Sequence, residues 1–256
     1  MNKVEIKNTV EKLIDTFLEA GKVCLDLRKK GLIKKFKFDN TPVSNGDLEV
    51  NKIILKKLRE ITPEIPIVSE ETSENKSEKE LKDFWLIDPI DGTYEYINNL
   101  EEFTINAGLI IDKKPVAGLI YAPAKERMFY SFDDDSAFEL INGNTIKLDI
   151  TKNFNKDEIK FVSYSKKLKP EIEKIHKKLN VKKFYRVKSS LKFCLIAAGE
   201  YDGYVAEPRA CEWDIAAGHA ILKHAGGIVT DFEGNEILYG KKNFKNPSLI
   251  LKNKKV

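Results

Sequence analysis

An apolar run that ends in two acidic residues constrains this chain more than any other segment. Residues 84–88 have the apolar character of a buried strand, and we expect Pro89 to end it because proline cannot donate to a strand ladder. The turn that follows presents Asp91 beside the strand end, and Gly92 permits a tight bend. Thr93 then begins a helical turn that we expect over residues 93–98.

This strand–turn–helix segment offers both carboxylates and an anion site. A helix N-terminus has unpaired N–H donors and the positive end of the helix dipole, so the turn after Asp91 can bind phosphate. Mg²⁺ prefers oxygen ligands, often one or two carboxylates together with substrate phosphate. Asp88 and Asp91 are therefore candidates for a magnesium–phosphate site. The alternative is a capped helix behind two exposed aspartates, and the segment alone leaves both interpretations open.

Three other acidic residues stand at the ends of expected elements. Glu70 follows a short strand expected over residues 65–69, Asp47 stands at the start of the second helix, and Asp214 stands at the start of the helix expected over 213–224. Each one alone fits a helix cap or a solvated acid. Four acidic element ends that can converge on one place are harder to explain as caps, and together they favour a metal site.

The two halves of the chain differ in their pattern of elements. Residues 1–150 contain a long amphipathic helix that ends before Gly31, a second helix from about Asp47, and a largely antiparallel sheet, whereas strands and helices alternate from about Lys160. No low-complexity linker separates them, so we expect two tightly packed halves, 1–150 and 151–256, in one catalytic unit. The later strands are expected over 103–111, 115–121, 127–132, 161–164, 184–187, 203–206 and 228–231, the later helices over 170–179, 190–199 and 213–224, and a solvated tail over 252–256.

The composition excludes several classes of protein. Lys and Arg number 44 against 40 Asp and Glu, and a net charge of +4 is too small to indicate nucleic acid as the main partner. Cys24, Cys194 and Cys211 are too scattered for a disulfide framework or a zinc site and suit a reducing cytoplasm. No segment approaches the roughly 20 apolar residues of a membrane span. We expect a soluble, cytoplasmic protein, and a weak peripheral association with the inner membrane stays open.

Several motifs give the chain a family resemblance. The segment WLIDPIDGT, the upstream SEE and the downstream EWDIAAG resemble the lithium-sensitive, magnesium-dependent phosphatase superfamily that contains the inositol monophosphatases. Within it, the segments KFDNTPVSNGD, EFTINAGLI, PVAGLIYAP and KSSLKFC are similar to the 3′(2′),5′-bisphosphate nucleotidases. The resemblance extends over nearly the whole chain in the expected order. It implies the layered αβαβα sandwich of that superfamily, a fold with α+β and α/β character.

The resemblance also implies roles for individual residues. Two magnesium ions, or three, would be held by the side chains of Glu70, Asp88, Asp91 and Asp214 and by the backbone carbonyl of Ile90. Asp47 would lie at the edge of the site, near a third ion or the attacking water. Thr93 would orient that water together with Glu70 or Asp47. The phosphate would rest on the N–H groups of Gly92 and Thr93, beside Asp91 and Asp214.

A second group of residues concerns the substrate. Ser189, Ser190 and Lys192 match the motif with which the bisphosphate nucleotidases hold the phosphate that is not cleaved, although they could merely begin a helix. The chain departs from the resemblance at two positions. Many relatives carry lysine where it has Tyr94, and they tend to place an arginine near Ala206. The nearby Arg209 is a candidate to take over that contact.

The resemblance ranks three functions. Phosphate release from adenosine 3′,5′-bisphosphate, which gives AMP, comes first, and hydrolysis of inositol monophosphate comes second. A non-catalytic metal or nucleic-acid binder on the same scaffold comes last, because the acidic set is complete and no basic stripe with interleaved aromatic residues is present. We therefore expect a small phosphorylated metabolite as the partner and no stable nucleic-acid partner.

Overall fold

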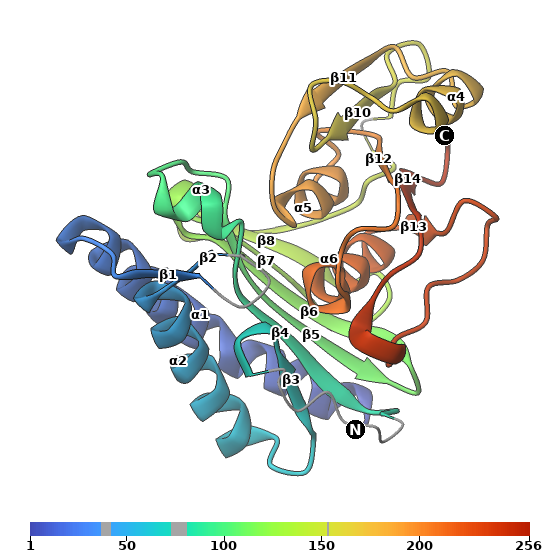
Figure 1. Ribbon diagram of the computed structural model, residues 1–256. Helices are drawn as coiled ribbons and strands as arrows, with labels where there is room; N and C mark the ends of the chain where they lie inside the picture. The colour runs from blue at the N-terminus through green and yellow to red at the C-terminus, as the bar shows by residue number, and fades with distance from the viewer. Residues whose placement is uncertain (37–41, 73–80, 153) are drawn as a thin grey trace.

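The chain folds into five alternating layers of helix and sheet, which confirms the expected αβαβα sandwich (Figure 1). The computed structural model describes residues 1–36, 42–72, 81–152 and 154–256. Helices form the first, third and fifth layers, a seven-stranded sheet forms the second and a five-stranded sheet the fourth. The helical layers contain α1 (Lys3–Lys30) and α2 (Asn45–Ile61), then α5 (Leu191–Ala197) and α6 (Glu212–His224), and finally α4 (Pro170–Lys178).

Helices α1 and α2 pack on one face of the seven-stranded sheet, and α1 ends before Gly31 as expected. Asp47 is not the N-cap of α2 but completes its capping box, because its carboxylate accepts from the backbone N–H of Ser44 at 2.7 Å. The cap is Ser44, whose side chain accepts from the backbone N–H of Gly46 at 3.1 Å, and Asp47 is the third residue of the helix. A short hairpin of β1 (Lys34–Phe36) and β2 (Pro42–Ser44) precedes α2. Residues 37–41 of the KFDNTPVSNGD motif lie outside the described part of the chain.

The seven-stranded sheet has the strand order β3-β4-β5-β6-β7-β8-β9. Only the β3–β4 pair is parallel, so the expected antiparallel sheet is confirmed. The hairpin of β8 and β9 was not expected, although Asn142 and Gly143, both at positive φ, supply its turn. The strands are β3 (Ile67–Ser69), β4 (Phe84–Asp91), β5 (Thr104–Ile111), β6 (Lys114–Ala122), β7 (Arg127–Ser131), β8 (Ala137–Ile141) and β9 (Asn144–Lys147), with single turns η1 (Glu70–Thr72) after β3 and η2 (Pro123–Lys125) after β6.

Strand β4 does not end at Pro89 as expected but continues to Asp91. The register between β4 and β5 shifts at this point. Asp88 pairs with Asn106 and Asp91 pairs with Thr104, so two residues of β4 between these pairs lie opposite a single residue of β5. Such an irregularity tolerates a proline, since the extra residue makes no regular ladder bond. Both aspartates therefore stand at the same end of one strand, the neighbour of the edge strand β3, just before the short helix α3 (Thr93–Ile97).

Helix α6 lies directly on the opposite face of the seven-stranded sheet. Gly108 and Gly118 permit this close approach. A β-carbon at Gly118 would lie 2.2 Å from the carbonyl oxygen of Ala217, and one at Gly108 would lie 2.6 Å from the β-carbon of Ala216. The two glycines thus let the helix bring its first turn, with Asp214, to the end of β4.

The five-stranded sheet has the order β11-β10-β12-β14-β13 and contains the expected strands, with one addition. The end of the chain forms β14 between β12 and β13, so the expectation of a solvated tail is wrong for its first residues. Leu251 is fully buried there, and Asn253 donates to the carbonyl of Ile150 at 2.8 Å. The strands are β10 (Lys160–Ser163), β11 (Lys183–Arg186), β12 (Gly203–Ala206), β13 (Gly227–Thr230) and β14 (Leu249–Asn253), with the turn η3 (Lys242–Phe244) before β14.

Candidate active site

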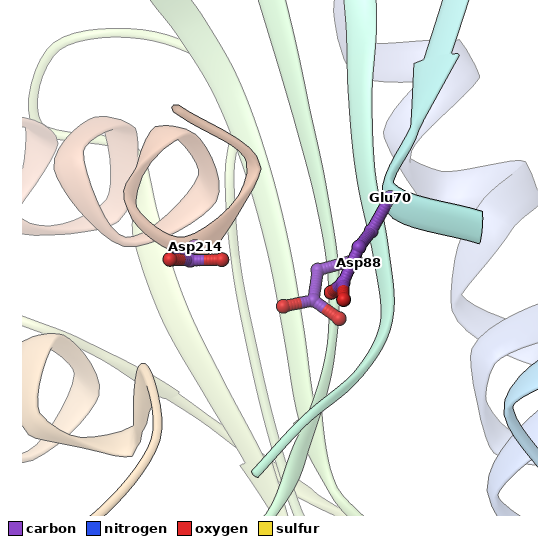
Figure 2. A group of neighbouring side chains, drawn as sticks. All are labelled: Glu70, Asp88 and Asp214. Carbon is purple, nitrogen blue, oxygen red and sulfur yellow. The ribbon is translucent and has the colours of Figure 1, made fainter. Parts of the chain in front are cut away.

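Three carboxylates from three different elements converge at the end of β4. Glu70 opens η1 after β3, Asp88 belongs to β4, and Asp214 lies in the first turn of α6. One oxygen of each lies within 4.8 Å of the others. Figure 2 shows the side chains approaching one another from the sheet and from the helix. Residues that lie up to 144 positions apart in the sequence are thus neighbours, as their placement at element ends predicted.

The electrostatics of this cluster suit a bound cation. Asp88 is 1% exposed, and its Oδ1 has no hydrogen-bond partner among the described residues. Burial, followed by the charges of Glu70, Asp91 and Asp214, raises the pKa of Asp88 well above its usual range. Burial, followed by the charges of Asp91 and Glu70, also raises the pKa of Asp214 well above its usual range. Buried like charges with an unpaired oxygen fit a hard divalent ion such as Mg²⁺, which takes carboxylate oxygens as ligands.

Asp91 borders this cluster but is not one of the three converging carboxylates. Its Oδ2 accepts a short hydrogen bond from the backbone N–H of Ser190. Burial raises the pKa of Asp91 to about 6, although the charge of Lys192 and the Ser190 N–H oppose the shift. The carbonyl of Ile90 lies within 3.1 Å of the Thr93 hydroxyl and is itself buried.

Asp47 and Thr93 form a polar pair at the edge of the cluster. The hydroxyl of Thr93 lies 3.1 Å from Oδ1 of Asp47, while Oδ2 of Asp47 accepts from the backbone N–H and the hydroxyl of Ser44 at 2.7 and 2.6 Å. Burial raises the pKa of Asp47, and these hydrogen bonds limit the shift. The capping interaction of α2 therefore also fixes a carboxylate against Thr93.

A cavity of about 230 Å³ opens beside the carboxylates. Its lining contains most of the residues that the sequence suggested for the substrate: Asp91, Gly92, Ser189, Ser190, Lys192, Arg209 and Asp214. Ala206 lines the same cavity as Arg209, so the arginine does lie near the position where relatives tend to have one. Glu70, Asp88, Asp47 and Thr93 are not in this lining.

The segment before α5 supplies a buried cation to the cavity. The ammonium group of Lys192, which is 8% exposed, donates to the carbonyl of Ser189 and lies 5.3 Å from the ring centroid of Tyr204. Burial lowers the pKa of Lys192 to about 8, against the attraction of Asp91. The hydroxyl of Ser190 contacts Thr104 and Asn106, both at 2.7 Å, and does not cap the helix. Ser190 therefore reaches the site through its backbone N–H.

The cavity lining also contains polar residues that the sequence analysis did not select, namely Glu95, Tyr164, Lys188 and Tyr204. Tyr164 and Tyr204 lie in the strands expected over 161–164 and 203–206. Lys188 begins the KSSLKFC motif, and Glu95 lies just after the DGT turn. Their positions at element ends were the available signal. Residue type gave no signal for the two tyrosines, because tyrosine is common both in protein cores and at surfaces.

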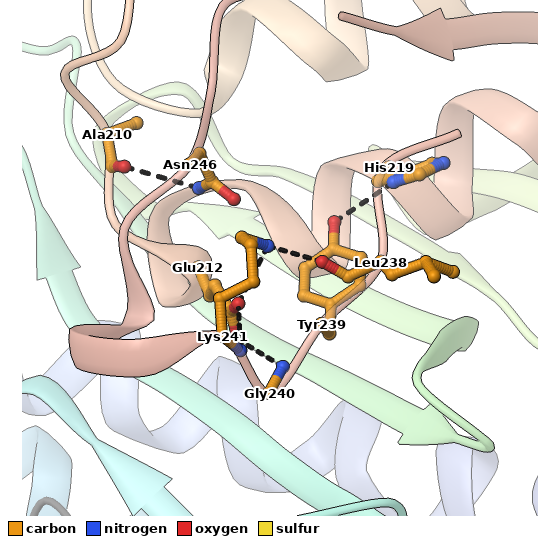
Figure 3. A network of polar contacts seen from close by, with 8 residues as sticks. All are labelled: Ala210, Glu212, His219, Leu238, Tyr239, Gly240, Lys241 and Asn246. Carbon is orange, nitrogen blue, oxygen red and sulfur yellow. Dashed lines mark hydrogen bonds and ion pairs between the residues drawn. The ribbon is translucent and has the colours of Figure 1, made fainter. Parts of the chain in front are cut away.

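A polar network anchors the first turn of α6, which carries Asp214 (Figure 3). The fully buried carboxylate of Glu212 accepts from the backbone N–H groups of Gly240 and Lys241 at 2.8 and 2.9 Å and lies 2.7 Å from the Lys241 ammonium group. The backbone N–H and side-chain amide of Asn246 donate to the carbonyl of Ala210 at 3.1 and 3.2 Å. The segment before β14 thus holds the helix start in place.

Comparisons with known proteins agree with one another. A sequence model of the inositol monophosphatase family matches residues 7–255. The 3′(2′),5′-bisphosphate nucleotidase CysQ of Buchnera aphidicola subsp. Acyrthosiphon pisum is 36% identical over 242 residues, which cover 91% of this chain and 90% of that protein. The protein of the same name from Salmonella typhimurium is 34% identical over 213 residues, which cover 82% and 85%.

A solved structure leads to the same assignment. CysQ from Bacteroides thetaiotaomicron, described as a bacterial member of the inositol monophosphatase family, superposes with a TM-score of 0.79 at 29% identity. The superposition covers 96% of this chain and 97% of the other. The family model, the similar sequences and the shared fold extend over the same residues that build the carboxylate cluster, and this chain belongs to the inositol monophosphatase family.

Proposed function

We propose that this chain is a magnesium-dependent phosphomonoesterase, and in particular a 3′(2′),5′-bisphosphate nucleotidase that converts adenosine 3′,5′-bisphosphate to AMP and phosphate. The observation that carries the proposal is one cavity with two kinds of charge. Asp91 and Asp214 join it to the carboxylate cluster, and Lys188, Lys192 and Arg209 line it as cations. A substrate with one phosphate to cleave and one to hold matches that division, and the bisphosphate nucleotidases among the relatives support it.

Magnesium would be held by Glu70, Asp88 and Asp214, with Asp91 and the Ile90 carbonyl as further ligands for a second or third ion. A magnesium ion held there would supply acidification of a water molecule and neutralisation of charge on the phosphoryl oxygens. Inhibition by lithium is part of the proposal. The three cysteines are free thiols, which suits the reducing cytoplasm in which we place the reaction.

Thr93 and Asp47 would orient the attacking water. A hydroxyl donates one hydrogen and accepts two, so Thr93 can donate to Asp47 or Ile90 and accept from water. Asp47 is held by Ser44 and cannot turn away without losing those hydrogen bonds. The pair therefore presents a fixed acceptor, and no serine or histidine nucleophile is needed.

Lys192 would hold the phosphate that is not cleaved. An ammonium group has three N–H donors, and one of them is used by the Ser189 carbonyl. Burial makes the remaining donors effective, because a charge-assisted hydrogen bond is stronger where water is excluded. The backbone of Ser189 and the ring of Tyr204 keep the ammonium group at the cavity wall.

A phosphate-release assay with magnesium tests the proposal on adenosine 3′,5′-bisphosphate, adenosine 3′-monophosphate and inositol monophosphate. We expect wild-type kcat/KM to be highest for the bisphosphate. Lys192→Met keeps the length of the side chain, and it should lower the bisphosphate-to-monophosphate ratio of kcat/KM by about 10- to 100-fold, the effect of about 1.5–3 kcal/mol for a charged hydrogen bond.

Lys114→Met is the matched control, since Lys114 is an exposed lysine in an ion pair with Glu236. It should leave the ratio unchanged. Equal losses on both substrates in Lys192→Met would assign Lys192 to the fold. A wild-type preference for inositol monophosphate would replace the proposed substrate with the second candidate, and turnover in excess chelator would remove the metal mechanism.

A further inference from the structure

Arg209 is stacked on the ring of Tyr164 at the wall of the cavity. The guanidinium carbon of Arg209 lies 3.6 Å from the ring centroid, whereas the other cation–π contacts among the described residues measure 5.0–5.8 Å. Tyr164 directly follows β10, and Arg209 lies in the loop between β12 and α6. Both side chains line the cavity. A distance of 3.6 Å is van der Waals contact between two flat groups.

Among the described residues, no carboxylate pairs with Arg209. The acid nearest to it in sequence, Glu207, is paired instead with Lys169 at 2.5 Å. Lys188 lies 5.8 Å from the same Tyr164 ring. The Tyr164 ring therefore lies against Arg209 and near Lys188 without neutralising either charge. This wall of the cavity stays positively charged.

We propose that Tyr164 is a positioning residue that holds the Arg209 guanidinium at the cavity wall, where it binds the uncleaved phosphate of a bisphosphate substrate alongside Lys192. This inference rests on the proposed function and adds the residue that makes Arg209 effective. Arg209 is exposed and lies in a loop, so its long side chain would otherwise sample many rotamers.

The geometry suits phosphate recognition. A guanidinium presents its N–H donors in one plane and can bind phosphate through two parallel hydrogen bonds. Stacking uses the face of that plane and leaves the donors at its edge for a ligand. Fixing the group before the substrate arrives removes part of the ordering cost of binding. A lysine cannot replace it, since an ammonium group has no plane to stack.

Substitutions at both residues test the inference through the bisphosphate-to-monophosphate ratio of kcat/KM. Arg209→Ala should lower the ratio about 10- to 100-fold. Tyr164→Leu should lower it about two- to fivefold, and Tyr164→Phe, which keeps the ring face, should retain it. In the Arg209→Ala background, Tyr164→Leu should have no further effect, because Tyr164 acts through the arginine.

Two more variants complete the test, one as a control and one that does not depend on the folding of Tyr164→Leu. Tyr185→Leu is the matched control: Tyr185 is 42% exposed on β11, its ring lies 5.5 Å from that of Tyr201, and it is outside the cavity lining, so the ratio should not change. Arg209→Lys alters only an exposed residue and should lower the ratio even if Tyr164→Leu fails to fold.

The outcomes separate this inference from the proposed function. An unchanged ratio in Tyr164→Leu, equal losses on both substrates, or an equal loss in the Arg209→Ala background would overturn the role of Tyr164 while wild-type preference for the bisphosphate remained. A retained ratio in Arg209→Lys would also overturn the need for stacking. Absence of that preference in the wild-type protein would instead overturn the proposed function.

Discussion

The hydroxyl of Thr93 lies 3.1 Å from Oδ1 of Asp47, across 46 residues of sequence. Asp47 is the third residue of α2, and Thr93 is the first residue of α3 after β4. The contact therefore links the helical layer on one side of the seven-stranded sheet to the end of β4. It also places a hydroxyl group beside the carboxylate cluster with its orientation fixed.

Thr93→Val should lower kcat on the order of a hundredfold and change KM little, because misplacing an attacking group by about 1 Å has an effect of that size. Valine has the shape of threonine without the hydroxyl. Thr93→Ser keeps the hydroxyl and should retain most of the activity. Steady-state kinetics at saturating magnesium measure both parameters. A raised KM with unchanged kcat in Thr93→Val would place Thr93 in substrate binding instead.

Magnesium should stabilise the wild-type protein in the absence of substrate. A ligand that binds only the folded state raises the free energy of unfolding by about 2.7 kcal/mol at a concentration 100 times its Kd. We expect Tm to rise with magnesium concentration in the wild-type protein and to rise much less in Asp88→Asn. Thermal unfolding followed by circular dichroism measures this without an activity assay. Equal Tm increases in the two proteins would remove Asp88 from the ligand set.

Asp91→Asn should stabilise the metal-free protein most at neutral pH. Burial raises the pKa of Asp91 from 3.8 to about 6, so the folded state binds a proton more tightly than the unfolded state between these values. A raised carboxyl pKa makes the contribution of this group to stability increase as the pH falls through about 6 and level off below about 4. The protonated wild-type carboxyl then resembles the amide of the variant.

Urea unfolding in chelator at pH 7.5 and pH 4.5 measures that difference. The gain in the free energy of unfolding for Asp91→Asn over wild type should shrink at the lower pH. Asp157→Asn, at an exposed residue of a surface turn, serves as the matched control. A gain that grows as the pH falls would have the wrong sign and would contradict the raised pKa.

The carboxylate cluster was predictable because its members stand at the ends of elements, where strands and helices of a layered fold expose their side chains. Glu70, Asp88 and Asp214 were each chosen for that reason, and the structure brings them together. The stack of Arg209 on Tyr164 was not predictable. The two residues are 45 positions apart in different loops, and no periodicity in the sequence relates such positions.

Two features of the fold were missed for physical reasons. Pro89 was expected to end β4, but the shift of register opposite Asn106 and Thr104 accommodates it, and a single sequence does not show where a bulge occurs. A solvated tail was expected over residues 252–256 because of its lysines, but Lys252 and Asn253 belong to β14. Its burial depends on two neighbours, β12 and β13, that arrive from earlier parts of the chain.

The anchor of α6 gives the last prediction. Both oxygens of the Glu212 carboxylate are used, one by the Gly240 N–H and one by the Lys241 N–H and ammonium group. Glu212→Gln replaces one of these acceptors with an amide NH₂, which faces a backbone donor and leaves it unpaired. An unpaired buried donor costs about 1–3 kcal/mol, and we expect urea unfolding to show a loss of that size.

Lys241→Met is the matched control for Glu212→Gln. It removes the ammonium group of Lys241, whose side chain is 30% exposed, but keeps both backbone hydrogen bonds to Glu212. We expect a smaller loss of stability in this variant, because water already screens part of that ion pair. Magnesium affinity from isothermal titration should fall in Glu212→Gln and stay close to wild type in Lys241→Met, since only the first disturbs the turn that carries Asp214. Equal losses of stability in the two variants would mean that the ion pair, and not the pair of backbone hydrogen bonds, anchors the helix.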